Sequence, residues 1–197
     1  ALAIREAALV GDAAAAIAAL DDHRLLCAHR EGPWGVQHWN RLVERWLGDA
    51  TGQPVGPGWG HEWYAGRPLL VTANDYGLEL FNGDTGVVVS DGEDLRAVVA
   101  GAREHRSFAT SRLGDVETLH AMTVHKSQGG QAREVTVLLP PDDSPLLTRE
   151  LFYTAVTRAE ERVRVVGTEA AVRAAVETRA QRATGLRRRL VEPGSTL

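Results

Sequence analysis

A polar loop near position 125 holds the residues of this chain best suited to chemistry. In order, they are His125, Lys126, Ser127, Gln128, Gly129 and Gly130. The β-branched residues before them predict a short strand over 118–124, so the loop would begin where a strand ends. Such a loop presents backbone N–H groups, which bind phosphates well. Because ligands of open parallel sheets sit at the carboxyl ends of the strands, the loop indicates a phosphate site there.

One member of this loop is unusual in the chain. Lys126 is the only lysine, and arginine takes every other position of this charge type. The compact ammonium of lysine and the planar guanidinium of arginine are not interchangeable at a tight site. A functional requirement at Lys126 would explain the exception, and chance is the alternative.

Several segments resemble motifs of one helicase family. Residues 123–129 resemble motif V of superfamily 1 helicases, in the form used by the RecD family, and residues 151–159 resemble motif VI. Residues 74–76 and 81–86 are similar to the segment that leads into a small inserted barrel in that family. The segments follow the family's order, and the resemblance covers roughly residues 24–167.

The resemblance assigns a nucleotide-binding set of residues. They are Arg30, Gln128, Gly129, Gln131 and Arg158. Arg158 would be the arginine finger, which stabilises charge on the γ-phosphate during hydrolysis. The alternatives are a turn arginine for Arg30 and, for Arg158, a surface arginine paired with Glu161. The family usually has an acidic residue where this chain has Gln131, and an amide would bond a ribose hydroxyl without charge assistance.

The same resemblance assigns a second set of residues to DNA. They are Thr123, His125, Lys126 and Asn74. Thr123 and His125 could instead belong to the signalling path between the nucleotide and DNA sites. The formal net charge of the chain is −4, so DNA contacts are expected to be local rather than spread over the surface. Arg187, Arg188 and Arg189 could also touch phosphates, although a solvated chain end is the simpler interpretation.

The resemblance implies an ATP-dependent DNA helicase subunit that moves 5′ to 3′ on single-stranded DNA. It would act in a repair exonuclease of the exonuclease V type, beside RecB-like and RecC-like subunits. ATP and Mg²⁺ would be held mainly by a domain outside this chain, because the sequence contains no P-loop of the form G-x-x-x-x-G-K-S/T. The chain, which starts at Ala1 without a methionine, is expected to be a fragment and inactive alone. A non-catalytic RecA-like module that binds DNA or protein, or the helicase part of a relaxase, are the alternatives.

Composition argues against a disulfide-bonded, zinc-binding or membrane-spanning protein. The single cysteine, Cys27, excludes an internal disulfide and a cysteine-based zinc site, and its apolar neighbours predict a buried strand position. No stretch reaches the apolar length of a membrane span and no signal peptide is evident, so the cytoplasm is expected.

Patterning together with the resemblance predicts an α/β fold. The expected architecture is a RecA-like parallel sheet with flanking helices and an inserted, small, antiparallel SH3-like β barrel. The expected divisions are an N-terminal helical segment at 1–22, the motor domain at 23–76 and 118–190, and the insert at 77–117. Residues 67–73 are expected to form a strand of the larger sheet, and residues 134–139 a central strand buried on both faces.

Two helical segments carry further expectations. Asp12 can cap a helix that runs to Leu20, within a helical hairpin. Apolar residues at helical spacing predict a helix over 36–47, with Trp39 and Trp46 on one face. Packing is the favoured role for both tryptophans, and a stacking platform for single-stranded DNA is the alternative.

Overall fold

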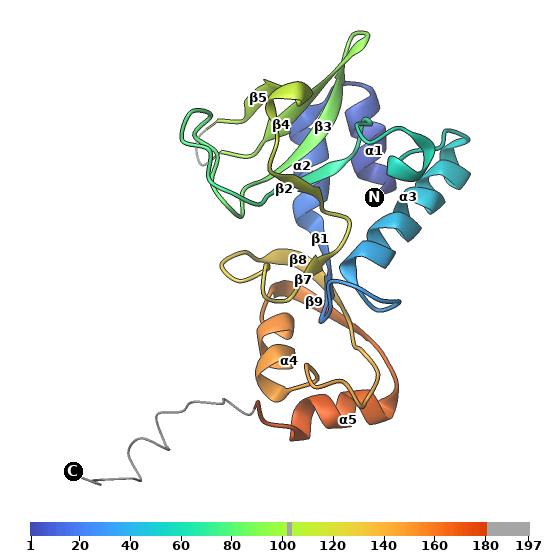
Figure 1. Ribbon diagram of the computed structural model, residues 1–197, viewed down its shortest axis with the longest axis vertical. Coiled ribbons are helices and arrows are strands. Elements are labelled where there is room, and N and C mark those ends of the chain that lie inside the picture. The colour runs from blue at the N-terminus through green and yellow to red at the C-terminus, as the bar shows by residue number, and fades with distance from the viewer. Residues whose placement is uncertain (102–103, 181–197) are drawn as a thin grey trace, which may run out of the picture.

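Two β-sheets lie one above the other along the long axis of the molecule in a computed structural model, which describes residues 1–101 and 104–180 (Figure 1). The first sheet is parallel, with the order β7-β1-β8-β9. The second is antiparallel, with the order β5-β4-β3-β2-β6. The chain is thus mixed α/β with a parallel sheet, as predicted.

The elements have the following bounds. The parallel strands are β1 (His23–Cys27), β7 (Met122–Thr123), β8 (Ala132–Leu138) and β9 (Ala159–Val166). The antiparallel strands are β2 (Pro68–Val71), β3 (Thr85–Asp91), β4 (Asp94–Val99), β5 (Arg106–Ala109) and β6 (Val116–Thr118). The α-helices are α1 (Leu2–Leu9), α2 (Ala13–Asp22), α3 (Val36–Thr51), α4 (Arg149–Val156) and α5 (Glu169–Glu177). Short 3₁₀ turns occupy Pro57–Trp59 and Thr110–Arg112.

Strand β8 is the centre of the parallel sheet, between β1 and β9. Val135 and Val137 are fully buried and pack with residues of α4 and α5, which lie at the end of the molecule away from the antiparallel sheet (Figure 1). The predicted central position of this strand is confirmed, but burial of both faces is confirmed only in part, because Glu134 and Thr136 are half-buried. Cys27, at the end of β1, is buried as predicted.

The helical hairpin α1–α2 packs on the antiparallel sheet. Val87 and Val89 of β3 point toward these helices, whereas Val88, between them, joins a separate core on the other face. This alternation follows from the two-residue period of a strand. Asp12 accepts a hydrogen bond from Ala15 N at 2.9 Å, so the predicted cap of α2 is confirmed.

Strand β2 belongs to a different sheet from the one predicted. It pairs antiparallel with β3 and with β6, so the expectation that residues 67–73 join the larger sheet is wrong. All four residues of β2 are buried, and an apolar run of this kind suits either sheet. The next strand along the chain decides the outcome, because residues 81–84 turn β2 back onto β3.

The antiparallel sheet is open between its outer strands. Strands β5 and β6 form its two edges and are not hydrogen-bonded to one another in the part of the chain that the structure describes, so the predicted closed barrel is not seen. The sheet also extends beyond 77–117, because β2 starts at Pro68. The division of the chain into domains stays a prediction.

The predicted strand over 118–124 is two short strands in different sheets. Strand β6 ends at Thr118 in the antiparallel sheet, and β7 begins at Met122 in the parallel sheet. Asn40 of α3 fixes the link between them, since its amide donates to Thr118 O at 2.9 Å and accepts from Ala121 N at 2.8 Å. The polar loop that follows β7 is therefore anchored close to both sheets.

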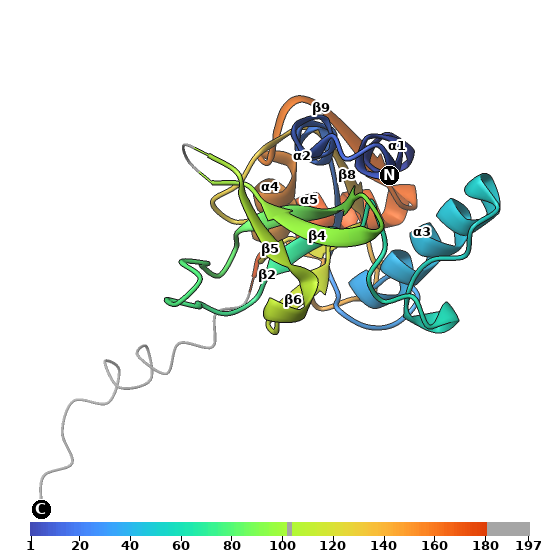
Figure 2. The ribbon, with the colours of Figure 1, turned by 90° about the horizontal axis from the view of Figure 1, so that it is seen from above.

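Helix α3 extends further than predicted and projects from the two sheets (Figure 2). Trp39 is partly buried, but Trp46 is 51% exposed, so packing was the wrong expectation for Trp46. The rings of the two tryptophans meet edge to face at 6.2 Å. No helix among the described residues is long and apolar enough to cross a membrane. Arg187, Arg188 and Arg189 lie outside the described residues.

Candidate functional site

The polar loop between β7 and β8 is a series of tight turns. Ser127 N donates to Thr123 O at 3.2 Å, and the buried Ser127 hydroxyl donates to Val124 O at 2.7 Å. Gly129 has a φ of 93°, a backbone conformation that glycine adopts without steric cost. These bonds hold the loop from within, and the side chains of His125 and Gln128 remain exposed.

Arg158 lies against this loop from the other side. It follows α4, and its Nε donates to Thr154 O at 3.1 Å while Nη1 donates to Gly130 O at 3.2 Å. Within residues 1–101 and 104–180 no carboxylate forms an ion pair with it, and Glu161 contacts Arg133 instead. The alternative pairing of Arg158 with Glu161 is therefore not observed. Arg158 therefore places a positive charge beside the loop. The groups that accept its hydrogen bonds are neutral oxygens, not carboxylates.

A cavity of about 710 Å³ opens between the polar loop and α4. His125 and Gln128 line it from the loop, and Thr148 and Thr154 line it from the helix and its cap. Thr148 accepts a hydrogen bond from Leu151 N at 3.3 Å, which caps α4. Residues of the segments that resemble motif V and motif VI therefore line the same cavity.

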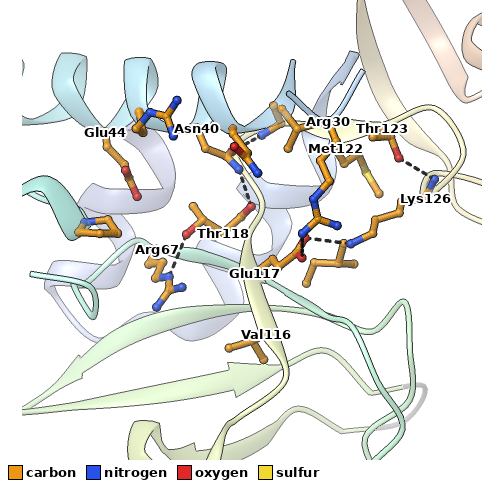
Figure 3. Close-up of a pocket in the computed structure, with 16 residues that line it drawn as sticks. Arg30, Asn40, Glu44, Arg67, Val116, Glu117, Thr118, Met122, Thr123 and Lys126 are labelled. Atoms are coloured by element: carbon orange, nitrogen blue, oxygen red, sulfur yellow. Dashed lines mark hydrogen bonds and ion pairs between the residues drawn. The ribbon is translucent and has the colours of Figure 1, made fainter. Parts of the chain in front are cut away.

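A second cavity, of about 310 Å³, lies where the two sheets meet α3, and we call it the junction cavity (Figure 3). Its charged and amide-bearing walls include Arg30, Asn40, Glu44, Arg67, Glu117 and Lys126. These residues come from the loop after β1, from α3, from the paired strands β2 and β6 or the residue just before β2, and from the polar loop.

Glu117 bridges two cations of the junction cavity. Its Oε1 lies 2.7 Å from Arg30 Nη2, and its Oε2 lies 2.9 Å from Lys126 Nζ (Figure 3). Burial acts to raise the pKa of this carboxyl, but the hydrogen bonds and charges of Lys126 and Arg30 lower it overall. Glu117 therefore stays ionised and pairs with both the chain's one lysine and an arginine, although its single negative charge offsets only one of the two positive charges.

The deeper wall of the junction cavity contains a buried carboxyl. Glu44 is buried, and its Oε1 accepts from the Tyr64 hydroxyl at 3.2 Å. Burial raises the pKa of Glu44, and the charges of Arg67 and Arg41 oppose that effect. The Tyr64 hydroxyl also lies 2.8 Å from Nε2 of His120, so a hydrogen-bond chain joins α3 to the link between the sheets.

The residues predicted to bind nucleotide do not all lie at one site. Arg30 follows the carboxyl end of β1, whereas Arg158 precedes the amino end of β9; in a parallel sheet these are opposite edges. Gln128 and Gly129 belong to the polar loop near Arg158, and Gln131, at its end, is exposed. Arg30 instead forms an ion pair with Glu117, which also pairs with Lys126 of the predicted DNA-binding set.

The predicted DNA residues are also divided. Thr123 and Lys126 line the junction cavity, and His125 lines the cavity beside α4. Asn74 lies after β2 in the antiparallel half, where its Oδ1 accepts from Asn82 N at 2.8 Å. Asn74 is not among the residues that line the junction cavity.

Sequence reasoning missed three charged residues of the junction cavity. Glu117 lies in a short strand and Arg67 directly before one, where residues are ordinarily structural, and Glu44 lies on a helix where an exposed position is the ordinary expectation. The nearest available clue was Arg67 itself, a cation directly before the apolar run of β2. Among the described residues, no group of three or more His, Cys, Asp or Glu side chains is placed to hold a metal ion.

Comparison with known proteins agrees with this geometry. Residues 118–166 match the family model for a UvrD-like helicase C-terminal domain, and they span the polar loop, α4 and Arg158. The Pif1 helicase from Candida albicans shares the fold, with a TM-score of 0.50 at 11% identity over 87% of this chain and 50% of that one. Residues 118–166 are thus similar to a helicase C-terminal domain, and the likeness to Pif1 shows the fold alone.

Two relatives narrow the class. RecBCD enzyme subunit RecD from Mycolicibacterium smegmatis is 66% identical over 98% of this chain and 34% of its own length. The ATP-dependent RecD2 DNA helicase from Deinococcus radiodurans is 31% identical over 85% of this chain and 23% of its own length. The chain belongs to the RecD family. It spans about a third of the length of the RecD subunits that it matches.

Proposed function

We propose that this chain is the C-terminal motor part of an ATP-dependent DNA helicase subunit in a RecBCD-type repair exonuclease. The observation that carries the proposal is Arg158, a cation without a carboxylate partner among the described residues, held by Gly130 O against the loop that resembles motif V. An arginine held in this way is available to a phosphate from outside the chain. The identity to RecD over nearly the whole chain supports the same conclusion.

In this proposal Arg158 acts as the arginine finger on an ATP held mainly by another part of the protein. Its planar guanidinium can donate two hydrogen bonds to phosphate oxygens as negative charge develops on them. Gln128, Gly129 and Gln131 would approach the nucleotide from the polar loop, which exposes them. Mg²⁺ would be bound with the ATP phosphates by the part that contains a P-loop, where it neutralises phosphate charge.

Single-stranded DNA is the proposed track, with movement from 5′ to 3′. Thr123 and Lys126 in the junction cavity, His125 beside α4 and Asn74 after β2 would contact it. The antiparallel sheet is, in this proposal, the counterpart of the SH3-like insert of the family, in an open form. RecB-like and RecC-like subunits are the proposed partners, and the relatives named as RecBCD subunits support this.

The test is unwinding by the full-length protein together with its partner subunits. We expect ATP-dependent unwinding of a duplex that carries a 5′ single-stranded tail, and much slower unwinding when only a 3′ tail is present and the partner motor is inactivated. Strand binding without ATP hydrolysis would contradict the proposal and favour a non-catalytic binding module. A preference for the 3′ tail would contradict the proposed polarity.

A further inference from the structure

Strand β9 is the long edge of the parallel sheet. It has eight residues, whereas the other outer strands of the two sheets, β7, β5 and β6, have two, four and three. Every residue of β9 after Ala159 is exposed. Proteins usually keep edge strands short, because a long, exposed edge is a template for pairing with another strand. The length and exposure of β9 therefore need an explanation.

The backbone of β9 has hydrogen-bonding groups that no strand in residues 1–101 and 104–180 uses. Val166 O accepts from Leu139 N at 2.9 Å, so the backbone of Val166 faces β8. Successive residues of a strand direct their N–H and C=O groups to opposite sides, which places those of Val163 and Val165 on the outer side. No described strand pairs with β9 on that side. An added strand would find two donors and two acceptors there.

The exposed valines of β9 continue a buried apolar face. Val163 and Val165 are in register with Val135 and Val137 of β8, which pack with residues of α4 and α5. Residues in register point to the same face of a sheet. The β8 valines are each 1% exposed, but Val163 is 39% and Val165 37% exposed. Apolar side chains of an added strand would extend this core and remove valine surface from water, which is favourable.

The opposite face of β9 has a cation with no carboxylate partner among the described residues. Arg164 lies between the two valines, so its side chain points to the other face. It is exposed and forms no ion pair within the described part of the chain, whereas Arg162 is paired with Glu134 at 2.6 Å. Opposite charges on neighbouring strands stabilise a sheet. A complementary strand would therefore place an acidic residue beside Arg164, between two apolar residues.

A second copy of β9 fits this edge poorly. In an antiparallel pair about a two-fold axis, Val163 opposite Val163 would bring Arg162 opposite Arg164 of the other copy. Val163 opposite Val165 would bring the two copies of Arg164 face to face. Like charges directly opposite one another destabilise a sheet. The charge pattern therefore favours a different polypeptide.

We propose that the outer edge of β9 pairs with an extended segment of a partner subunit. The segment has an apolar–acidic–apolar pattern, with its carboxylate beside Arg164 and its apolar side chains beside Val163 and Val165. Exposed apolar surface on a subunit marks a place that another protein covers. The choice of a subunit rests on the proposed function, in which RecB-like and RecC-like proteins assemble with this one.

The test is amide hydrogen exchange, resolved to single residues, in the full-length protein alone and assembled with its partner subunits. We expect the amides of Val163 and Val165 to exchange at least about tenfold more slowly after assembly, because each gains a hydrogen bond. The amides of Arg164 and Val166 face β8 and are the internal control, so they should change by less than about twofold. Unchanged exchange at both valines would overturn the proposal.

Other occupants of the edge give different results. Slow exchange at both valines in the full-length protein alone would mean that another part of the same polypeptide covers β9. Slow exchange that appears without partner subunits, and only as the protein concentration rises, would mean that a second copy covers it. Either result overturns the assignment to a partner subunit.

A proline variant tests the pairing of the backbone. Val165→Pro removes the outward N–H and leaves the hydrogen bonds to β8 in place, as proline in an edge strand allows. Val165→Ala is the matched control, because it shortens the side chain and keeps the N–H. We expect Val165→Pro to weaken binding of the partner subunits at least about tenfold, and Val165→Ala less than about threefold. An equal loss in both variants would contradict strand pairing.

A charge reversal tests the acidic residue of the segment. Arg164→Glu should weaken binding at least about fivefold in low salt. Arg173→Glu, at an exposed arginine of α5 that pairs with Glu169, should weaken it less than about twofold. An equal effect of the two reversals would contradict the assignment. Melting temperatures show whether the variants are folded; if Val165→Pro is not, Arg164→Glu and the exchange measurement decide the proposal.

The same assembly experiment separates two failures. A full-length protein that forms no complex with RecB-like and RecC-like subunits contradicts the proposed function, and the proposed occupant with it. A complex that forms while Val163 and Val165 keep their exchange rates contradicts only the pairing at β9.

Discussion

Arg158 and Lys126 show two ways in which a single cation can be kept available. Arg158 is held by neutral oxygens, so its charge is not cancelled within the described part of the chain. Lys126, in contrast, forms an ion pair with Glu117, with 2.9 Å between Lys126 Nζ and Glu117 Oε2. The first arrangement suits a group that must reach a phosphate without first breaking an ion pair. The second suits a group whose binding depends on competition.

At the residue scale, the positions of the polar-loop residues were easier to predict from the sequence than the positions of the residues that line the junction cavity. The loop position of His125, Lys126 and Gln128 could be predicted, because polar residues and glycines that follow a β-branched run favour a turn. Glu117 and Arg67 could not, because their importance depends on which strands become neighbours. Strands β2 and β6 are far apart in the chain, and only their pairing brings the two side chains to one cavity.

A pH-dependent stability follows from His120. Burial, with the charges of the N-terminal amine and of Arg67 adding to it, lowers the pKa of His120 from an ordinary 6.5 to about 3. The unfolded chain therefore binds the proton more readily than the folded one, and stability falls as the pH drops below 6.5. We expect the free energy of unfolding to decrease by about 1 kcal/mol between pH 7 and pH 5.5.

Urea unfolding of wild type and His120→Gln across that range measures this effect. The variant should lose the part of the pH dependence that His120 contributes, together with the hydrogen bond to Tyr64, whereas His23, whose pKa burial also lowers, keeps its own part. The range stops at pH 5.5 because the raised pKa of Glu44 acts in the opposite direction at lower pH. An unchanged slope in the variant would show that His120 is not the titrating group.

At the scale of elements, α4 determines where Arg158 lies, and its amino end depends on one cap. Thr148 accepts from Leu151 N, and removal of such a cap costs about 0.5–2 kcal/mol. Thr148→Ala should therefore lower the free energy of unfolding by about 1 kcal/mol, while Thr148→Ser, which keeps the hydroxyl, should change it little. Denaturant titration of the three proteins decides the matter. Equal loss in both variants would point to the methyl group instead of the cap.

The pairing of β3 with β4 leaves no room at Gly86. A Cβ there would lie 2.5 Å from Val98 O and 3.0 Å from Val99 Cα, both backbone atoms that cannot move aside. Gly86→Ala is expected to destabilise the protein by about 1–3 kcal/mol, the range for overpacking. Gly114→Ala is the control, because nothing lies within 4 Å of its Cβ position. Similar melting temperatures for Gly86→Ala and wild type would show that the two strands can separate without cost.

Element types were more predictable than their partners. Helix α2 with its Asp12 cap, helix α3 and strand β8 follow from apolar periodicity and capping. The sheet to which β2 belongs, and the division of 118–124 between two sheets, depend on long-range pairing that periodicity does not encode. Trp46 shows a related limit, since helical spacing identifies a face of α3 but not whether another element covers it.

For the whole molecule, the absence of a P-loop from the sequence makes a simple prediction. The 197-residue chain alone should release no phosphate from ATP, with or without single-stranded DNA, because no element in it matches the phosphate cradle of this enzyme class. A phosphate-release assay on the purified chain, with Arg158→Ala as the blank, checks it. Release above the blank would mean that an unrecognised nucleotide site lies within the chain.

The central claim is that Arg158 stabilises the transition state of ATP hydrolysis in the assembled helicase. The most direct measurement is DNA-stimulated ATP turnover by the full-length protein with its partners, beside its affinities for nucleotide and single-stranded DNA. Arg162→Ala is the matched control, since Arg162 lies only four residues away but is exposed and paired with Glu134.

For Arg158→Ala and Arg158→Lys we expect turnover to fall at least about a hundredfold, since arginine fingers contribute about 10³–10⁵ in rate and lysine lacks the planar fork. Nucleotide and DNA affinities should change far less, and Arg162→Ala should behave as wild type. If turnover of the Arg158 variants stays within about threefold of wild type, a difference of roughly 0.65 kcal/mol, Arg158 is a structural arginine and the account of the site is contradicted.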